Sequence, residues 1–313
     1  MPSLKAIRNR ITSVKSTQKI TRAMKMVAGA RLNRAQTRIT ELRPYAVKVQ
    51  EVLSQITREV ERAGAEVEAA RPGEGSIEKP AHPLLVRRPE QRVLMVVLTS
   101  DRGLCGAFNT NINKRAEREW RERKDQGQDV QLMLIGRKGR DYFTRRGAPI
   151  LEYLPGVWDK LNLESAKRVG TQVLQPFLRG DVDAIYLVYN EFKSAMTQNV
   201  TVERLLPAGA PAAPLGASEG TAQAEVAAEF LFEPNKEALL EQLAPMYVEV
   251  SVLRALYEST ASELGARMTA MDSATKNATE MIDGLTLKFN KARQAAITKE
   301  LMEIIGGSEA LKD

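Results

Sequence analysis

The amino-acid sequence predicts an α/β protein in which the N- and C-terminal helices form a long antiparallel coiled coil and the middle of the chain forms a small Rossmann-like α/β domain with a parallel sheet. Three observations predict this architecture. Apolar residues recur at helical spacing over residues 1–62 and again over residues 230–313. Continuous apolar segments of strand length lie between them. Aromatic residues make up only 5% of the 313 residues, so the bulky rings that fill most globular cores are scarce.

Residues 1–62 have the pattern of one amphipathic helix. Its apolar, small and polar seam positions recur mostly at steps of three and four: Leu4, Ile7, Ile11, Val14, Gln18, Thr21, Met24, Val27, Ala28, Ala35, Ile39, Leu42, Val49, Leu53, Ile56 and Val60. Pro44 interrupts the pattern, but a proline can kink a helix without ending it. At 1.5 Å per residue this helix would be about 90 Å long, so it needs a partner along its length. Because Gln18 and Thr21 belong to the seam, we expect a partly polar contact.

The N-terminal segment carries the basic excess of the chain. Residues 1–60 hold 13 Lys and Arg against 3 Glu, whereas the whole chain has a formal charge of +7. A transit peptide has a similar composition, but the apolar stripe continues well past any cleavable presequence. Nucleic-acid binding would lack stacking partners, since Tyr45 is the one aromatic residue in this segment. Contact with nucleic-acid phosphates and attraction to an acidic protein surface both remain open at this point.

The middle of the chain alternates strand and helix patterns. Apolar strands are predicted at 93–99, 130–136 and 182–189, with an added edge strand at 196–206, and helices at 107–126, 137–146 and 163–179. The α/β domain therefore spans 92–206. It is flanked by a loop or insertion at 63–91 and by a low-complexity loop at 207–229, which is rich in Ala, Gly and Pro.

The C-terminal helix shows the spacing of a left-handed coiled coil. Its seam advances in steps of four and three: Leu239, Leu243, Met246, Val250, Leu253, Tyr257, Thr260, Leu264, Met268, Met271, Thr275, Ala278, Ile282, Leu285, Phe289, Ala292 and Ala296. Pro245 lies near its start, and Gly306 and Gly307 are expected to end it. Two long helices joined through a compact domain predict antiparallel pairing.

Composition excludes several kinds of site. One Cys and one His cannot supply the ligand set of a zinc, haem or iron–sulfur centre, nor an internal disulfide. No Gly is followed by Lys, so the phosphate-binding GxxxxGK[ST] loop is absent. The turn at 101–106 follows a strand and opens a helix but lacks GxGxxG spacing, and Cys105 within it is expected to be a buried small residue rather than a nucleophile. We therefore expect no catalytic residue, cofactor or metal, and a nucleotide-binding enzyme is the weakest reading.

Four blocks of sequence resemble the γ subunits of F-type ATP synthases. They are IRNRITSVKSTQKITRAMKMVAGARL at 7–32, TSDRGLCGAFN at 99–109, ALYESTASELGARMTAMDSATKNA at 255–278 and NKARQAAITKELMEIIGG at 290–307. The resemblance covers nearly the whole chain, departing at the two loops and at Ser308, where the family usually has Ala. It implies a non-catalytic central rotor stalk that couples ion-driven rotation of a membrane c-ring to ATP synthesis at the β subunits.

The resemblance also implies partners and contact residues. The partners would be the α and β subunits of an α3β3 ring, the ε subunit and the c-ring. Lys19, Arg22 and Lys25 resemble cations that face an acidic lever of β, and Met24, Arg267, Gln294, Thr298 and Glu300 resemble residues at which the shaft meets β. Gln294, Thr298 and Glu300, at i, i+4 and i+6, are expected on one face, and the apolar tip 295–305 in a hydrophobic collar. For each residue the alternative is a solvated helix position, or for Met24 a seam position.

Localisation follows from the same resemblance. A peripheral position at the cytoplasmic face of a bacterial plasma membrane is expected, with attachment through the partners, because no separate presequence precedes the matched blocks. A basic coiled-coil protein that binds nucleic acid is the alternative function.

Overall fold

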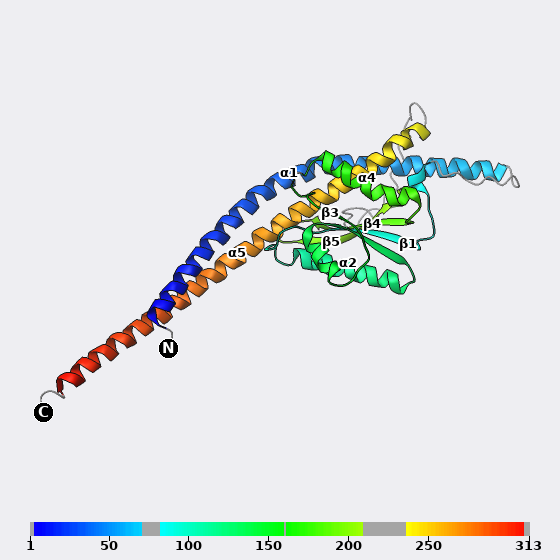
Figure 1. The fold of residues 1–313 in the computed structure, drawn as a ribbon. Helices are drawn as coiled ribbons and strands as arrows, with labels where there is room; N and C mark the ends of the chain where they lie inside the picture. Colours follow the sequence, from blue (N-terminus) through cyan, green and yellow to red (C-terminus); the bar gives the residue numbers. More distant parts are fainter. Residues whose placement is uncertain (1–2, 71–81, 160, 209–235, 310–313) are drawn as a thin grey trace. The chain divides into compact units, whose positions relative to one another are not determined.

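The computed structural model describes residues 3–70, 82–159, 161–208 and 236–309, shown in Figure 1. The chain divides into two compact units, one made of Met1–Arg31 with Arg267–Asp313 and the other of Leu32–Ala266. The two terminal helices contribute residues to both units. Each unit is described by itself below.

The N-terminal helix α1 is longer than the sequence predicts. It spans Leu4–Ala70, so residues 63–70 belong to the helix and not to the expected loop. It passes through Pro44 without a break, as expected. Pro44 is exposed, so the carbonyl that loses its usual amide partner lies on a face open to water. Of the rest of the expected 63–91 loop, the 3₁₀ turn Pro83–Leu85 is described and residues 71–81 are outside the described residues.

The C-terminal helix α5 spans Lys236–Glu309 and includes Pro245. The expectation that Gly306 and Gly307 end this helix is wrong, because both lie inside it. A glycine inside a helix costs only about 1 kcal/mol relative to alanine, so two glycines near an end do not have to stop it. The low-complexity loop predicted at 207–229 lies outside the described residues apart from 207 and 208.

The α/β domain in the second unit has a five-stranded sheet with the order β3-β2-β1-β4-β5. The strands are β1 Arg92–Leu98, β2 Asp129–Ile135, β3 Ile150–Leu154, β4 Ala184–Phe192 and β5 Gln198–Leu206. All neighbouring strands run parallel except β4 and β5, which are antiparallel. The parallel sheet with an added edge strand is therefore confirmed, and β3 is a strand that the sequence did not predict.

Helices cover both faces of this sheet (Figure 1). They are α2 Phe108–Asp125, α3 Arg137–Thr144 and α4 Leu163–Arg179. Successive residues of β1 point to opposite faces: Val93, Met95 and Val97 pack with α2 and α3. Leu94 and Val96 belong to the other core, which is formed with α4 and with the second-unit parts of α1 and α5. The two long helices thus form part of a wall of the domain core.

A close approach of backbone joins the carboxyl ends of β1 and β2. The Thr99 hydroxyl donates to the carbonyl oxygen of Ile135, and the Gly139 amide donates to the Thr99 hydroxyl at 2.8 Å. Gly136 has a positive φ of 96°, and a Cβ placed on it would lie 2.0 Å from the Thr99 carbonyl oxygen. Glycine is therefore required here both for its backbone conformation and for space.

We predict that Gly136→Ala lowers the free energy of unfolding by more than about 2 kcal/mol, because strain and a backbone clash add together. Gly127→Ala is the matched control, since Gly127 also has a positive φ but has open space around it. It should cost only about 1 kcal/mol. Urea denaturation followed by tryptophan fluorescence measures both, because Trp120 and Trp158 lie in the α/β domain. Equal losses would contradict the clash.

Candidate functional site on the paired terminal helices

The first unit is an antiparallel pair of helix segments. The Gln18 amide donates to the Thr279 hydroxyl at 2.8 Å, and the hydroxyls of Thr21 and Thr275 lie 2.8 Å apart. Residues later in α1 contact residues earlier in α5. Lys25 pairs with Asp272, and a Cβ placed on Gly29 would lie 3.4 Å from the Met268 sulfur. This order of contacts confirms the predicted antiparallel pairing.

The seam between these segments is narrow and mixed in character. Ile7, Ala28, Met271 and Ala278 are buried apolar members, and Thr21 is a buried polar one. Small and polar residues let the helices approach closely but bury little apolar area, so the pair is thinner than a leucine zipper. The predicted seam is correct here with the exception of Val27, which is 52% exposed.

Lys25 is part of the pairing. Its ammonium lies 2.5 Å from a carboxylate oxygen of Asp272, and Lys276 lies 3.3 Å from the other oxygen. The hydrogen bond from Lys25, followed by the one from Lys276, lowers the pKa of Asp272 below its usual value. Lys25 is half-buried in this contact, so its charge is already paired within the chain.

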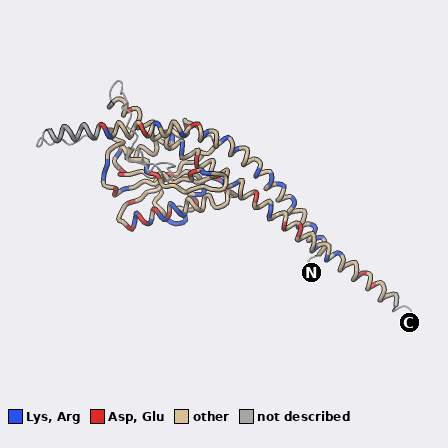
Figure 2. The backbone as a smooth tube through the Cα atoms, turned by 180° about the vertical axis from the view of Figure 1, so that it is seen from behind, with Lys and Arg blue, Asp and Glu red and all other residues tan. Residues whose placement is uncertain are grey.

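Four other predicted contact residues differ in exposure. Three lie on α1, and one lies where the α5 segment of the first unit begins. Lys19 and Arg22 are exposed, whereas Met24 and Arg267 are half-buried. Figure 2 shows Lys and Arg recurring along the N-terminal part of α1, where residues 1–40 contain no Asp or Glu. The exposed surface of α1 in this unit therefore carries one sign of charge.

The three predicted contact residues near the end of α5 are all exposed. In the α-helix that the structure shows, Gln294 and Thr298 share a face, but a residue six positions on is rotated by about 120°. Glu300 therefore does not lie on that face, and the expectation of one face for all three is wrong. Any partner that contacts all three must surround the helix end.

The C-terminal end of α5 extends beyond the N-terminal end of α1. The guanidinium of Arg8, close to the start of α1, lies 5.5 Å from the ring centroid of Phe289, so the residues that follow Phe289 soon have no facing helix. Five large apolar side chains there are exposed: Ile297, Leu301, Met302, Ile304 and Ile305. A contiguous exposed apolar surface marks an interaction site, and this tip has the character of the predicted apolar end.

Sequence reasoning missed exposed apolar side chains in the N-terminal part of α1. Ile20 and Met26 are exposed, together with Val27, which was assigned to the seam. A detectable signal was present, since Ile20 and Met26 are apolar residues off the seam spacing in a strongly basic helix. These side chains add apolar area to the charged surface around Lys19 and Arg22.

The turn after β1 is held by polar contacts to the start of α2. Cys105 is buried, as predicted, and its sulfur accepts a hydrogen bond from the Asn109 amide at 3.2 Å. At the neighbouring end of β4, where nucleotides bind in many α/β folds, α5 is in contact instead: the Ser262 hydroxyl donates to the Asn190 carbonyl oxygen. Among the described residues no cluster of potential metal ligands occurs, and none of the described helices is long and apolar enough to cross a membrane.

A pair of antiparallel helix segments with a basic surface and an exposed apolar end, in a chain that also contains a Rossmann-like α/β domain, defines a class of interaction subunits. Residues 3–311 match the family model described as ATP synthase. The chain is 72% identical to an ATP synthase gamma chain of Sorangium cellulosum and 46% identical to one of Geobacter sp. (strain M21), with each comparison covering all of both chains. The chain therefore belongs to the gamma-chain family of F-type ATP synthases.

Solved structures agree with this assignment. A central-stalk chain of the Tetrahymena thermophila mitochondrial ATP synthase is 25% identical, with a TM-score of 0.57 over 82% of this chain and 99% of that one. A rotor chain of the Euglena gracilis mitochondrial ATP synthase, 18% identical, shares the fold with a TM-score of 0.60 over 94% of this chain and 98% of that one. The prediction of a non-catalytic subunit of this complex is confirmed.

The observed register predicts which cysteine pair will cross-link. In a Cys105→Ser background, Thr21→Cys with Thr275→Cys should form a disulfide on mild oxidation, because the two hydroxyls lie 2.8 Å apart. Thr21→Cys with Thr279→Cys is the control, displaced by about one turn. It should react at least about tenfold more slowly, since disulfide geometry tolerates little displacement. Gel mobility without reductant measures both, and a faster control pair would refute the register.

Proposed function

We propose that this chain is the rotating central shaft of a bacterial F-type ATP synthase, in which it couples ion-driven turning of a c-ring to ATP synthesis at the β subunits. The observation that carries the proposal is the first unit, a thin antiparallel helix pair with a basic surface and an apolar end. The similar Tetrahymena chain is described with a central stalk and c-ring, which supports the same partners here. Those partners are the α3β3 ring, the ε subunit and the c-ring.

The shape of the pair explains how such a subunit acts without catalysing a reaction. Two helices side by side have no three-fold symmetry, so within a ring of three identical β subunits each β meets a different surface. A ligand shifts a conformational equilibrium only by its different affinity for the two states, and the same holds for a shaft. Rotation therefore presents each β in turn with contacts that favour its open or closed form.

The charge of α1 suits a contact that must slide. Exposed ion pairs contribute at most about 1 kcal/mol each and are screened by salt. Lys19 and Arg22 can therefore attract an acidic lever of β without locking to it. Lys25, Met24 and Arg267 remain proposed contacts beside them, although Lys25 would have to leave or share Asp272.

The apolar end of α5 suits a bearing. We infer that the tip at 295–305 turns in an apolar collar formed by the ring, with Gln294, Thr298 and Glu300 at its rim. Because these three residues point in more than one direction around the helix, contact with all of them is natural inside a ring. The cytoplasmic face of the plasma membrane is the proposed location, reached through the c-ring.

Co-expression with the α and β chains of the same organism tests the proposal. A stable assembly with ATPase activity is expected. If the chain does not co-purify with α and β under conditions in which those two fold, the proposed function is rejected.

We predict that Lys19→Glu with Arg22→Glu lowers the ATPase activity of the α, β and shaft assembly by about threefold or more, because two attractive contacts become repulsive. Lys114→Glu with Lys124→Glu applies the same change of charge on α2, outside the paired helices, and both control lysines are exposed. The control should keep normal activity. A steady-state ATPase assay at two salt concentrations measures this, and an equal loss in the control would argue against a specific contact.

A second prediction concerns the end of α5. Gln294→Ala with Thr298→Ala should reduce ATP-driven proton pumping in the complete complex by about twofold to tenfold. It should leave the α/β domain folded, because both residues are exposed. Asn111→Ala on α2 is the control, since Asn111 is exposed and lies outside the paired helices. Wild-type pumping and assembly in the double variant would remove these two residues from the contact.

A further inference from the structure

One face of α5 in the second unit is bound to the α/β domain by specific contacts. Four residues spaced four, four and three apart form this face: Arg254, Glu258, Ser262 and Gly265. The Arg254 guanidinium donates to both carboxylate oxygens of Glu203 on β5, at 2.5 and 2.7 Å. A Cβ on Gly265 would lie 3.2 Å from the Cα of Ala195, so helix and loop backbones touch there. The face is therefore a joint between helix and sheet.

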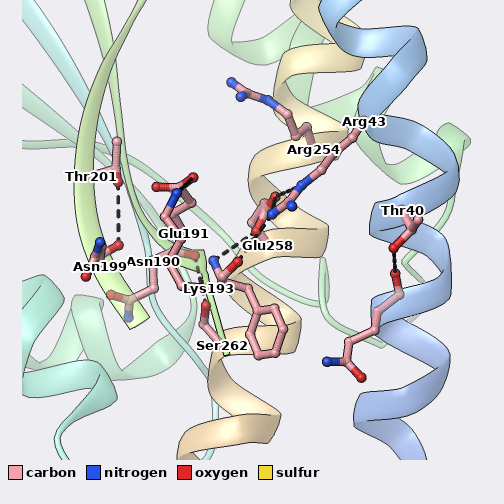
Figure 3. Close-up of polar contacts among 12 residues, drawn as sticks. Thr40, Arg43, Asn190, Glu191, Lys193, Asn199, Thr201, Arg254, Glu258 and Ser262 are labelled. Atoms are coloured by element: carbon pink, nitrogen blue, oxygen red, sulfur yellow. Dashed lines mark hydrogen bonds and ion pairs between the residues drawn. The ribbon is translucent and has the colours of Figure 1, made fainter. Parts of the chain in front are cut away.

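The carboxylate of Glu258 is the centre of this joint (Figure 3). One of its oxygens accepts hydrogen bonds from Arg43 Nε at 3.0 Å and Nη2 at 2.8 Å, and Arg43 belongs to α1. The other oxygen accepts from the Phe192 amide at 2.9 Å, at the end of β4. Arg43 Nη2 also donates to the Phe192 carbonyl oxygen at 3.2 Å. One side chain thus links α5, α1 and the interior strand β4.

The two partners of this ion pair are buried to very different degrees. The Glu258 side chain is 4% exposed, whereas that of Arg43 is 48% exposed. Removing the guanidinium leaves a buried carboxylate with one donor, while removing the carboxylate leaves an arginine that water can solvate. Loss of Arg43 should therefore be more damaging than neutralisation of Glu258.

A buried charge at this position fixes the orientation of α5 more sharply than an apolar side chain would. Apolar contacts are individually non-directional, so they fix the orientation of a helix less sharply than hydrogen bonds do, even where they pack closely. Hydrogen bonds to a carboxylate require specific distances and angles, and a small rotation of α5 about its own axis would strand the buried charge. The joint therefore resists twisting between the helices and the sheet.

We propose that Glu258 is the positioning residue through which torque passes between the α/β domain and the two long helices, with Arg43 as its essential partner. This inference rests on the proposed function as a shaft. It predicts that a weakened joint matters only when the α/β domain is under load. An assembly of the chain with α and β alone applies no such load, whereas the complete complex turning its c-ring does.

The test compares Arg43→Met, Glu258→Gln and the double variant in both assemblies. In the soluble assembly, the ATPase activity of each variant should stay within about twofold of wild type. In the complete complex, the ratio of protons pumped to ATP hydrolysed should fall by about threefold or more for Arg43→Met. Glu258→Gln should fall less, and the double variant no further than Glu258→Gln, because a neutral amide oxygen can still accept from the Phe192 amide. Thr40→Ala is the control, since the Thr40 hydroxyl donates only within its own helix, to the Gln36 carbonyl oxygen.

An unchanged pumping ratio in all three variants would overturn the proposal. So would an equal loss of activity in the soluble assembly, which would make the joint a general requirement of folding. If Arg43→Met does not assemble, Glu258→Gln decides the matter by the same two assays. Failure of the wild-type chain to form an active assembly would instead count against the proposed function, so the two failures are distinguishable.

Discussion

Helices of this length gain little stability from helix propensity alone, because most helical stability in proteins comes from burying an apolar face. The contact between α1 and α5 supplies that face in both units. In the first unit the described segments of the two helices pack on each other, and in the second unit both helices also close the core beside α4. The scarcity of aromatic residues follows from this, since a thin seam made mostly of Ala, Thr and aliphatic side chains has little space for rings. Without the pairing there would be neither a rod nor a wall for the domain.

The pairing also sorts the cations of α1 into different roles. Lys25 lies on the edge of the seam and meets Asp272, so its charge is balanced within the chain. Arg43 lies on the side that faces β4 and Glu258, where it completes a buried carboxylate. Lys19 and Arg22 point away from the seam and stay exposed. One basic helix thereby contributes to its own register, to the joint with the domain and, in the proposed function, to a surface for an acidic partner.

Sequence patterns predicted most of the fold, and the misses have physical causes. Strand β3 was not predicted because Glu152 interrupts its apolar residues, so the segment lacks a continuous apolar run. Val27 was misplaced because apolar character was equated with burial, whereas here it belongs to a surface. The Asp272 partner of Lys25 and the Arg43 partner of Glu258 could not be predicted, since each depends on a register between segments more than two hundred residues apart. Tyr189, whose pKa burial raises well above 10, donates to Glu203 in the same joint and gave no sequence signal beyond its place in a strand.

Rotation of the chain inside its complex is the central claim, and direct observation tests it. The variant Cys105→Ser with Lys124→Cys places one thiol on the exposed surface of α2, to which a bead can be attached while the α3β3 ring is fixed to glass. With ATP present, the bead should turn in one direction and pause three times per revolution, because a shaft without three-fold symmetry meets three equivalent β subunits in turn. A bead that stays still while the same molecules hydrolyse ATP would contradict the account.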